Sequence, residues 1–379
     1  MLKFGVTTAE LFAAVKVCQT LCSKKPINYQ SYRNQIKVSV TSTGTVCLTA
    51  FGNSTGAYSC VTFTANLAEH GVVAVDSKQL ADFLKTCPKG SVTAVVQVSI
   101  EQVVVTCGQI TARLNTMPLE DLPATTGVEV EGTKLEIQPD IFAQLIDSVL
   151  DSMSSDKTRC AINSIYVEAL GGYFSVTATD GHRLSNNSIC LDKDSETKAV
   201  SAIIPAEDAS ALYKALKLVK PSGVVNLTIG SNAVVVVFNS YSQRIELLDR
   251  SYPDYSRIIL ENTRPTTFVV KVPRDSLLGL LQQAKKCVYD SSHSIRLGLS
   301  DDNLRITSGN SQNFDGSLAV KYTKDDFATA FNVNYLLGAV KSFPVASILK
   351  LNFNATEDPL MLDSDDGTAL RVVVMPTRL

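Results

Sequence analysis

Apolar residues follow two spacings along this chain, and the two spacings alternate. Where they recur every three or four positions, they predict amphipathic helices. Where they alternate with polar residues or form short Val- and Ile-rich runs, they predict strands. The first kind covers Thr7–Leu21, Pro139–Met153 and Pro273–Val288. The second kind covers Val72–Val75, Ala94–Val98, Val103–Thr106, Val225–Thr228, Val234–Phe238, Leu349–Phe353 and Val372–Val374.

The same order of elements occurs three times. Predicted hairpins end at Phe51, Asp180 and Ser308, which are 129 and then 128 residues apart, each followed by glycine. Second helices open near Asp76, Pro205 and Asn332, at separations of 129 and 127 residues. A fixed period indicates one copied folding unit, and a period of this length matches a small domain. We therefore predict an α+β protein of three homologous domains, with linkers at Met117–Gly127 and Ser251–Pro265. The predicted domains are 1–124, 128–250 and 256–379.

Composition narrows the class of protein. The 379 residues are 45% hydrophobic and 19% charged, and no apolar run approaches the ~18 residues of a membrane span. We expect a soluble intracellular protein. The net charge of −2 argues against a protein that grips nucleic acid tightly, but not against one that surrounds it. The nine cysteines contain no C-x-x-C pair, which favours reduced, buried thiols and no metal site.

Lysines recur on the second helices. Lys78 and Lys85 lie on one helix face in the first copy, Lys214 and Lys217 in the second, and Lys341 in the third. In a single helix such lysines are ordinary solvated residues or favourable charges near the helix C-terminus. Their recurrence in three equivalent helices favours a basic surface that faces phosphates.

Four segments carry a resemblance to a known family. They are Ala178–Ser185 (ATDGHRLS), Ser251–Ile258 (SYPDYSRI), Phe331–Tyr335 (FNVNY) and Val373–Leu379 (VVMPTRL). In this order and on this repeat, the chain resembles the bacterial sliding clamp, the beta subunit of DNA polymerase III. The resemblance covers the second and third domains well, and the first mainly through its length and element order.

The resemblance implies a head-to-tail homodimer that closes into a ring of six domains. Helices line the bore and antiparallel sheets lie outside. Such a ring encircles duplex DNA without sequence preference and tethers the replicative polymerase through a peptide pocket between domains two and three. A clamp loader and other proteins with a clamp-binding motif are the further partners implied. The family member is a non-catalytic processivity factor of DNA replication, needs no cofactor, and works in the cytoplasm at the nucleoid.

Three sets of residues are predicted, and the first of them is carried over by position from the resemblance. The peptide pocket takes Ile162, Thr179, Gly181, His182, Arg183, Leu184, Pro253, Arg257, Ile258, Asn332, Tyr335, Val373, Val374, Met375, Pro376 and Arg378. The DNA-facing set is Lys24, Lys25, Lys78, Lys85, Lys157, Arg159, Lys214, Lys217 and Lys341. The dimer contact takes Ala112 and Leu114 from domain one, and Cys287 and Val288 from domain three.

Other classes of function stay in view. A catalytic interpretation pairs Asp180 with His182 and uses Ser185 or a cysteine as nucleophile, but such local spacing does not suit a triad. The sequence has no Gly-rich phosphate loop and no H-E-x-x-H motif. A peptide-binding scaffold that forms no ring, and a protein that grips DNA directly, are the remaining alternatives. Domain one also departs from the family at Ser23–Tyr32. Asp156 falls where a basic or amide group would suit DNA better, and Ser256 replaces a frequently basic residue.

Overall fold

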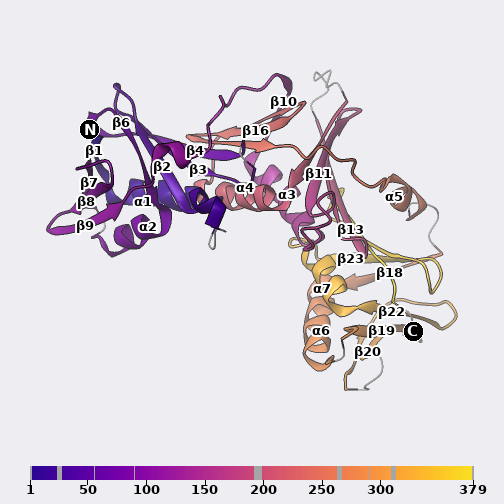
Figure 1. Cartoon of the computed structure of the whole chain (residues 1–379). Coiled ribbons are helices and arrows are strands. Elements are labelled where there is room, and N and C mark those ends of the chain that lie inside the picture. The colour runs from indigo at the N-terminus through magenta and orange to yellow at the C-terminus, as the bar shows by residue number, and fades with distance from the viewer. Residues whose placement is uncertain are drawn as a thin grey trace. The chain divides into compact units, whose positions relative to one another are not determined.

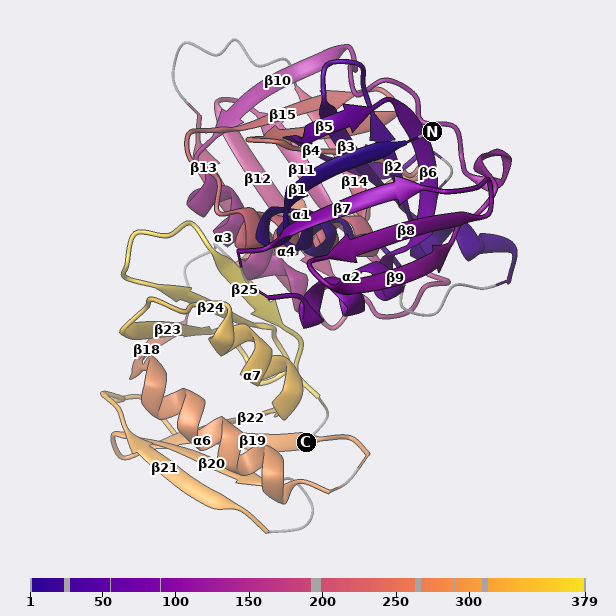
Figure 2. The ribbon, with the colours of Figure 1, turned by 90° about the vertical axis from the view of Figure 1, so that its left-hand side faces the viewer.

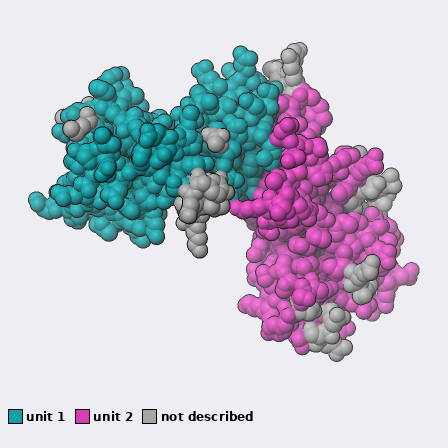
Figure 3. Space-filling model, in the orientation of Figure 1, with its two compact units in different colours: residues 1–143, 204–248 teal, residues 144–203, 249–379 magenta. Residues whose placement is uncertain are grey.

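The computed structural model describes residues 2–23, 28–54, 56–88, 90–191, 199–262, 267–289, 291–308 and 313–377. The chain divides into two compact units (Figure 3). Unit 1 comprises residues 1–143 and 204–248, and unit 2 comprises residues 144–203 and 249–379. The middle third of the sequence is therefore shared between the two units. The reason is that each unit is built round its sheets, and strands of the middle third belong to a sheet in each unit. The three domains predicted from the repeat stay a prediction.

The predicted order of elements occurs in each third of the chain (Figure 1). The first third holds β1 (Lys3–Thr7), α1 (Thr8–Cys18), β2 (Gln35–Val40), β3 (Thr45–Phe51), β4 (Tyr58–Thr64), β5 (Asn66–Glu69), β6 (Gly71–Asp76), α2 (Ser77–Thr86), β7 (Val92–Gln97), β8 (Gln102–Cys107) and β9 (Ile110–Asn115). The middle third holds β10 (Gly132–Ile137), α3 (Pro139–Leu150), β11 (Ser164–Leu170), β12 (Tyr173–Thr179), β13 (Arg183–Cys190), β14 (Val200–Pro205), α4 (Ala206–Val219), β15 (Val225–Gly230), β16 (Ala233–Phe238) and β17 (Tyr241–Glu246). The last third holds α5 (Ser256–Asn262), β18 (Phe268–Pro273), α6 (Arg274–Cys287), β19 (Ser294–Ser300), β20 (Asn303–Ser308), β21 (Asp315–Ala319), β22 (Phe327–Asn332), α7 (Val333–Lys341), β23 (Ile348–Phe353), β24 (Leu360–Ser364) and β25 (Arg371–Val374).

The helix starts lie where the sequence predicts them. Thr7 is the N-cap of α1, and its side chain accepts a hydrogen bond from the amide of Glu10. The second helices α2, α4 and α7 have their N-caps at Asp76, Pro205 and Asn332. Asp and Asn side chains at this position accept hydrogen bonds from first-turn amides that have no partner inside the helix. The threefold spacing of the second helices is thus confirmed.

Each unit contains two sheets whose described strand pairs are antiparallel. In unit 1 the orders are β5-β1-β7-β8-β9 and β10-β15-β16-β17-β4-β3-β2-β6. In unit 2 they are β14-β11-β12-β13-β25-β24-β23-β18 and β21-β20-β19-β22. Each eight-stranded sheet joins four strands of one repeat to four of the next, through β17–β4 in unit 1 and β13–β25 in unit 2. We call these pairings the unit 1 joint and the unit 2 joint.

The joints follow one rule and leave two strands over. In both joints, the last strand of one repeat pairs with the fourth strand of the preceding repeat: β17 with β4, and β25 with β13. β9 is the last strand of the first repeat, and no repeat precedes it. β21 is the fourth strand of the third repeat, equivalent to β4 and β13, and no repeat follows it. Neither strand therefore has a partner of this kind among the described pairings. Both lie at the edge of their sheets. Exposed edges of this kind are templates for pairing with another chain.

The helices cover the sheets from one side and bury the cores between the layers. In unit 2, α6 and α7 lie side by side over the strands (Figure 2). Leu277 and Leu281 of α6 are fully buried against Ile295 and Ile306 of the sheet. Among the described residues, no helix is both long and apolar enough to cross a membrane.

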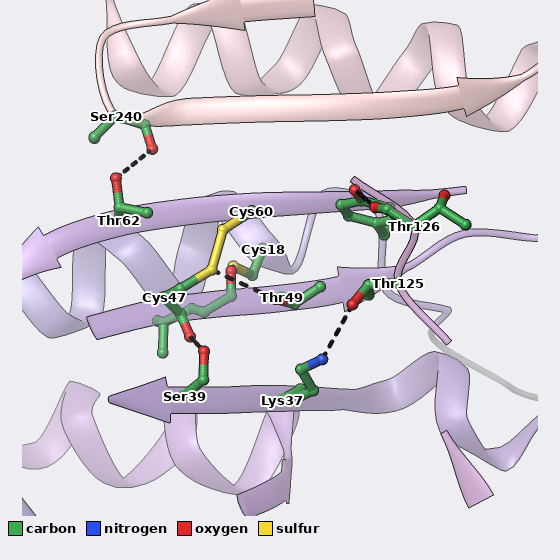
Figure 4. Close-up of a disulfide and its surroundings, with 12 residues drawn as sticks. Cys18, Lys37, Ser39, Cys47, Thr49, Cys60, Thr62, Thr125, Thr126 and Ser240 are labelled. Atoms are coloured by element: carbon green, nitrogen blue, oxygen red, sulfur yellow. Dashed lines mark hydrogen bonds between the residues drawn. A yellow bond between two sulfur atoms is a disulfide. The ribbon is translucent and has the colours of Figure 1, made fainter. Parts of the chain in front are cut away.

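Two expectations are corrected by the structure. Cys47 on β3 and Cys60 on β4 form a disulfide, so these thiols are not reduced (Figure 4). They are diagonal neighbours on one sheet face, because Cys47 pairs with Thr62 and Cys60 with Thr49. Cys160 and Cys190 are exposed, whereas Cys18, Cys87 and Cys107 are buried as expected. The linker expected at 251–265 also forms a short helix, α5, which its prolines concealed.

Candidate functional site

The unit 2 joint carries an apolar cluster apart from the main core. Leu184 of β13 pairs with Val373 of β25, and both are buried. Met361 of β24 completes this cluster, and Tyr255 and Ile258 pack on it from the linker. Side chains from three strands and α5 thus meet on one face of the sheet. We call the space beside this cluster the groove.

The groove is a cavity of about 650 Å³. It lies between the loop that follows α3, the turn after β12, and the linker with α5. It is lined by Thr158, Arg159, Cys160, Ala161, Ile162, Thr179, Gly181, Leu184, Arg250, Pro253, Asp254, Tyr255 and Ile258. Six of the residues predicted for the peptide pocket are among them: Ile162, Thr179, Gly181, Leu184, Pro253 and Ile258. The mixture of apolar walls and a few polar groups is typical of ligand sites.

Three tyrosines hold the linker wall of the groove. Tyr166 of β11 stacks on Tyr252, with ring centroids 4.9 Å apart. Tyr255 contacts both rings edge-on, at 6.0 and 6.2 Å. Asp254 then starts α5, since its carboxylate accepts hydrogen bonds from the amide and hydroxyl of Ser256, which lower its pKa. The linker is thereby anchored on the sheet before it turns over Leu184.

The turn from Thr179 to Arg183 forms the opposite wall. The Asp180 carboxylate accepts hydrogen bonds from the amides of His182 and Arg183 at 2.8 and 3.0 Å. Gly181 has a φ of +93°, which only glycine adopts without strain. Arg159 donates to the carbonyl of Asp180 at 2.9 Å. These hydrogen bonds fix the conformation of the turn. None of them joins the side chain of Asp180 to the side chain of His182 as an acid–base pair would require.

The exposed side chain of His182 points to the third repeat. Its ring stacks on Tyr335 of α7, with centroids 5.7 Å apart. Its carbonyl accepts the amide of Met375 at 2.8 Å, and the amide of Thr377 donates to Ala330 of β22 at the same distance. The segment Met375–Thr377 therefore runs from β13 to β22 as a strap, and Met375 is 40% exposed.

Arg183 makes several contacts within the chain. Its guanidinium lies 3.1 Å from Asp180 and 3.2 Å from Asp151, and it stacks 5.0 Å over Tyr335. Only 13% of the side chain is exposed. A Cβ on Gly338 of α7 would lie 2.2 Å from the Asp151 carboxylate and 2.6 Å from the guanidinium. Arg183 is thus bound within the chain, beside a second cavity of about 370 Å³.

The other predicted pocket residues have varied positions. Asn332 caps α7, and Val373 and Val374 are buried strand residues, with Val374 in the main core of unit 2. Pro376 lies in the strap. Arg257 is exposed and 3.8 Å from Asp254. Arg378 lies outside the described residues. The prediction missed Tyr255 and Met361, although the Tyr252–Tyr255 spacing before an apolar pair was a usable signal.

Most of the predicted DNA-facing lysines are exposed. Lys78 and Lys85 lie on α2, Lys214 and Lys217 on α4, Lys341 on α7, and Lys157 in the loop after α3. Arg159 lines the groove instead. Lys24 and Lys25 lie outside the described residues. The basic side chains of α2 and α4 are held by no ion pair among the described residues, apart from the contact of Lys217 with the Tyr213 ring at 5.5 Å.

The predicted dimer residues are only partly at a free surface. Ala112 lies on the edge strand β9 and is half-buried. Leu114 is 5% exposed and Val288 is 4% exposed, within the core of unit 2. Cys287 is half-buried at the end of α6. An edge strand of the last repeat that the sequence pattern did not single out is β21. Among the described residues, no group of three His, Cys, Asp or Glu side chains is placed to hold a metal ion.

Comparison with known proteins agrees with these features. Residues 136–254 match the family model of the central domain of the DNA polymerase III beta subunit, and residues 264–378 match that of its C-terminal domain. The chain is 25% identical over 316 residues to the beta sliding clamp of Haemophilus influenzae, covering 82% of this chain and 83% of that protein. It is 24% identical over 313 residues to that of Escherichia coli, with the same coverage.

Solved structures show the same fold over the whole chain. The beta subunit of DNA polymerase III from Thermotoga maritima matches with a TM-score of 0.89 at 19% identity, with both chains fully covered. A sliding clamp from Pseudomonas aeruginosa bound to griselimycin matches with a TM-score of 0.87 at 22% identity, again with both chains fully covered. The first repeat, which matches neither family model, shares the fold.

Proposed function

The chain belongs to the family of bacterial sliding clamps, the non-catalytic beta subunits of DNA polymerase III, and we propose that its groove is where the clamp holds its protein partners. The observation that carries the proposal is the cavity of about 650 Å³ at the unit 2 joint, with Leu184, Ile162 and Ile258 on its walls. Apolar side chains of a short extended peptide would fill it, and such anchors supply most of the affinity of a linear motif. The partners are the replicative polymerase, the clamp loader and other proteins that carry such a motif.

The clamp is proposed to work as a closed head-to-tail homodimer. Two equivalent pairings already operate inside the chain, β17 with β4 and β25 with β13. The strands left over, β9 and β21, are the two that the same rule would pair between subunits. A heterologous contact of this kind forms a ring when its rotation closes after two copies. This proposal puts the third-repeat side of the contact on β21, whereas the sequence-based prediction names Cys287 and Val288.

Duplex DNA is the proposed occupant of the ring. Lys78 and Lys85 of α2, Lys214 and Lys217 of α4, and Lys341 of α7 supply exposed cations on the equivalent second helices. Such contacts to phosphates carry no sequence information and weaken with salt. With a net charge of −2, the protein would hold DNA by enclosure more than by affinity. The place of work is then the cytoplasm, at the nucleoid.

The experiment for the groove is a truncation that the structure sharpens. Removal of residues 375–379 deletes the strap but spares Val374, which is buried in the core of unit 2. We expect this variant to lose binding of a polymerase-derived peptide, measured by fluorescence anisotropy, while its mass in light scattering stays that of the dimer. The matched variant Ile258→Asp changes a residue that lines the groove itself and should lose the peptide too. Unchanged peptide affinity in both variants would refute the groove.

The alternative classes are separated by salt and topology. A protein that grips DNA directly loses affinity with salt on circular and linear DNA alike. A ring should remain on a closed circle in high salt and leave once the circle is cut. A scaffold that forms no ring would bind the peptide but would be retained on neither DNA. Lys214→Glu with Lys217→Glu should slow loading onto primed DNA without unfolding the protein.

A further inference from the structure

The outer face of the four-stranded sheet in the third repeat is hollowed. A cavity of about 760 Å³ lies over β19, β20 and β22, and Gly298, Thr307 and Ala328 are among the residues that line it. This face points away from the core, because the neighbouring Leu297 and Ile306 are buried in the core that α6 covers. We call the cavity the outer hollow. It lies within unit 2 and shares no lining residue with the groove.

The first two repeats have a covered surface at the same place. In each repeat the same position of one strand pairs with a threonine of the next, and the pairs are Lys37–Thr49, Tyr166–Thr177 and Arg296–Thr307. Thr49 is 4% exposed and Thr177 is fully buried, whereas Thr307 is partly exposed. The equivalent threonine is therefore covered in the first and second repeats, and it is accessible from the outer hollow in the third.

Chain segments without helix or strand contribute to that cover. In the first repeat, the Lys37 ammonium donates a hydrogen bond to the Thr125 hydroxyl at 3.3 Å (Figure 4). In the second, Tyr252 stacks on the Tyr166 ring. Thr125 and Tyr252 both belong to the segment that follows the last strand of their repeat. Arg296 of the third repeat makes no hydrogen bond, ion pair or ring contact with any residue that the structure describes, so the place for such a segment is open.

We infer that the outer hollow is a docking site for an extended segment of another protein, one that carries an aromatic side chain close to a single carboxylate, and that Arg296 is its main contact. The inference does not rest on the proposed function of the groove. The chain itself contains a segment of this kind, Tyr252-Pro253-Asp254, whose tyrosine lies on the equivalent surface of the second repeat.

Gly298 supports the presence of an occupant. It follows Arg296 by two residues, and Ser39 and Glu168 stand at the same position in the other repeats. Glycine inside a strand weakens it and often marks a place where a ligand or another backbone approaches closely. A Cβ on Gly298 would meet no described atom within 4 Å, so the packing of the fold does not require glycine here. The missing side chain deepens the outer hollow.

The charges of the outer hollow define the chemistry of the segment. Arg305 is held by two hydrogen bonds to the Asp315 carboxylate, one of them 2.8 Å long. Arg296 remains as an exposed cation without a partner among the described side chains. A guanidinium stacks its face on an aromatic ring and binds a carboxylate with its edge. Asp326 also lines the hollow and repels further acidic residues, so a single carboxylate suits the site better than an acidic tract.

The test uses a labelled peptide with the sequence of residues 250–256 (RSYPDYS) and a C-terminal amide. Two twins of it replace the Asp by Asn, or both tyrosines by Leu. Binding to the full-length protein is measured by fluorescence anisotropy. Gly298→Phe fills the outer hollow, and Gly298→Ser, which has the side chain of the first repeat, is its matched control. Arg296→Gln removes the cation at an exposed position. Circular dichroism and light scattering check the fold and the mass of each variant.

We expect Gly298→Phe to weaken binding of the peptide by at least about tenfold, and Gly298→Ser to change it by less than about twofold. Arg296→Gln and the Leu twin should each lose about three- to tenfold, because the stack needs both the guanidinium and the ring. The Asn twin should bind wild type about two- to fivefold more weakly than the Asp peptide, since the ion pair is exposed. This last ratio should disappear in Arg296→Gln.

Four results overturn the inference. The first is no binding of the peptide to wild type. The second is equal binding to Gly298→Phe and Gly298→Ser or, if the Phe variant is unfolded, to wild type and Arg296→Gln. The third is binding that Ile258→Asp abolishes and Gly298→Phe keeps, which assigns the peptide to the groove. The fourth is self-association of wild type that Gly298→Phe removes, which assigns the outer hollow to a second copy of the chain.

Discussion

The two joints are built by the same strand pairing but have different interiors. At the unit 1 joint, Tyr241 and Gln243 of β17 and Ser59 of β4 are fully buried, and Arg244 is 7% exposed. Polar side chains therefore take a large share of that joint, beside the buried Val61. At the unit 2 joint Leu184 and Val373 make the face toward the groove apolar, whereas Ser185 is buried on the other face. One rule of backbone pairing thus supports a joint with buried polar side chains on both faces in unit 1 and a joint with one apolar face in unit 2.

The difference between the joints extends to the chain segment that crosses each of them. In unit 1, Thr125 and Thr126 are bonded to Lys37 and Tyr58, and no regular helix follows (Figure 4). In unit 2 the corresponding linker, anchored by tyrosines, forms α5 and places Ile258 over Leu184. A groove requires both an apolar joint and a wall held at a distance from it. The repeat supplies the joint, and the local sequence of the linker supplies the wall.

The largest effect is expected where a joint would form between subunits. Ile110 pairs with Cys107 across a two-residue turn, so the amides of Thr111 and Arg113 point away from β8. Proline removes an amide donor from an edge strand. Arg113→Pro should therefore convert the dimer to a monomer at micromolar concentration in light scattering. Arg113→Thr keeps the amide and should stay dimeric. A dimeric proline variant would disprove pairing through β9.

The next largest effect is the pH dependence of folding stability near the unit 1 joint. Asp208 of α4 is 2% exposed, and its pKa is raised to about 7 by burial, with a further contribution from the charge of Glu207. Gln243, and Arg33 through its pair with Glu207, are the other charged or polar groups that face it. The pKa is raised in the folded state, so the folded protein binds the extra proton, and stability falls as pH rises from about 4 to about 7.

Asp208→Asn removes that ionisation and keeps an acceptor for Gln243. At pH 8 the variant should be more stable than wild type by on the order of 3 kcal/mol in unit 1, and at pH 4 the gap should largely close. Hydrogen exchange of α4 at the two pH values measures it. Asp140→Asn, at an exposed helix start, is the control and should show no such pH dependence. A gap of equal size at both pH values would contradict the buried carboxylate as the cause.

A smaller effect is expected where α7 packs against the Asp151–Arg183 ion pair, beside the unit 2 joint. A methyl group on Gly338 would displace the Asp151 carboxylate and the Arg183 guanidinium, both of which are ends of flexible side chains. We expect Gly338→Ala to lower stability by about 1 kcal/mol, since it breaks a partly exposed pair while gaining helix propensity. Gly279→Ala on α6 meets open space and should raise stability by about 0.5–1 kcal/mol. Urea unfolding measures the stability of both variants. Equal gains in stability would contradict the displacement of the Asp151–Arg183 ion pair.

The smallest effect should appear at the wall of the groove. Tyr166→Leu removes the ring that stacks on Tyr252, and aromatic pairs contribute about 0.5–1.5 kcal/mol beyond their area. A looser wall should weaken binding of a polymerase-derived peptide about two- to fivefold, with the dimer unchanged. Tyr173→Leu, 54% exposed on the neighbouring strand, should have no effect on the peptide. Equal losses in both variants would indicate a general change of the sheet, not of the wall.

The sequence alone determined the local elements and their repetition. Helix starts at Thr7, Asp76 and Asn332 depend on a side chain and the amides two or three residues later, so neighbouring residues carry the whole signal. Strands such as Val234–Phe238 are marked by a short run of β-branched and aromatic residues, which is also local. The family resemblance located the groove through short motifs for the same reason, since each motif forms one turn or one strand end.

Only the tertiary structure decided which side chains serve the groove and which serve the fold. Arg183 and Leu184 are adjacent in sequence, but alternation on β13 sends the guanidinium to Asp151 and the leucine to Ile258. Arg159, which the sequence predicts as a DNA contact, donates a hydrogen bond to the carbonyl of Asp180 and lines the groove. The edge strand β21 and the buried state of Val288 depend on pairings between residues far apart in the chain. A single sequence does not encode such distances in any local pattern, because they arise when separate elements share one sheet and one core.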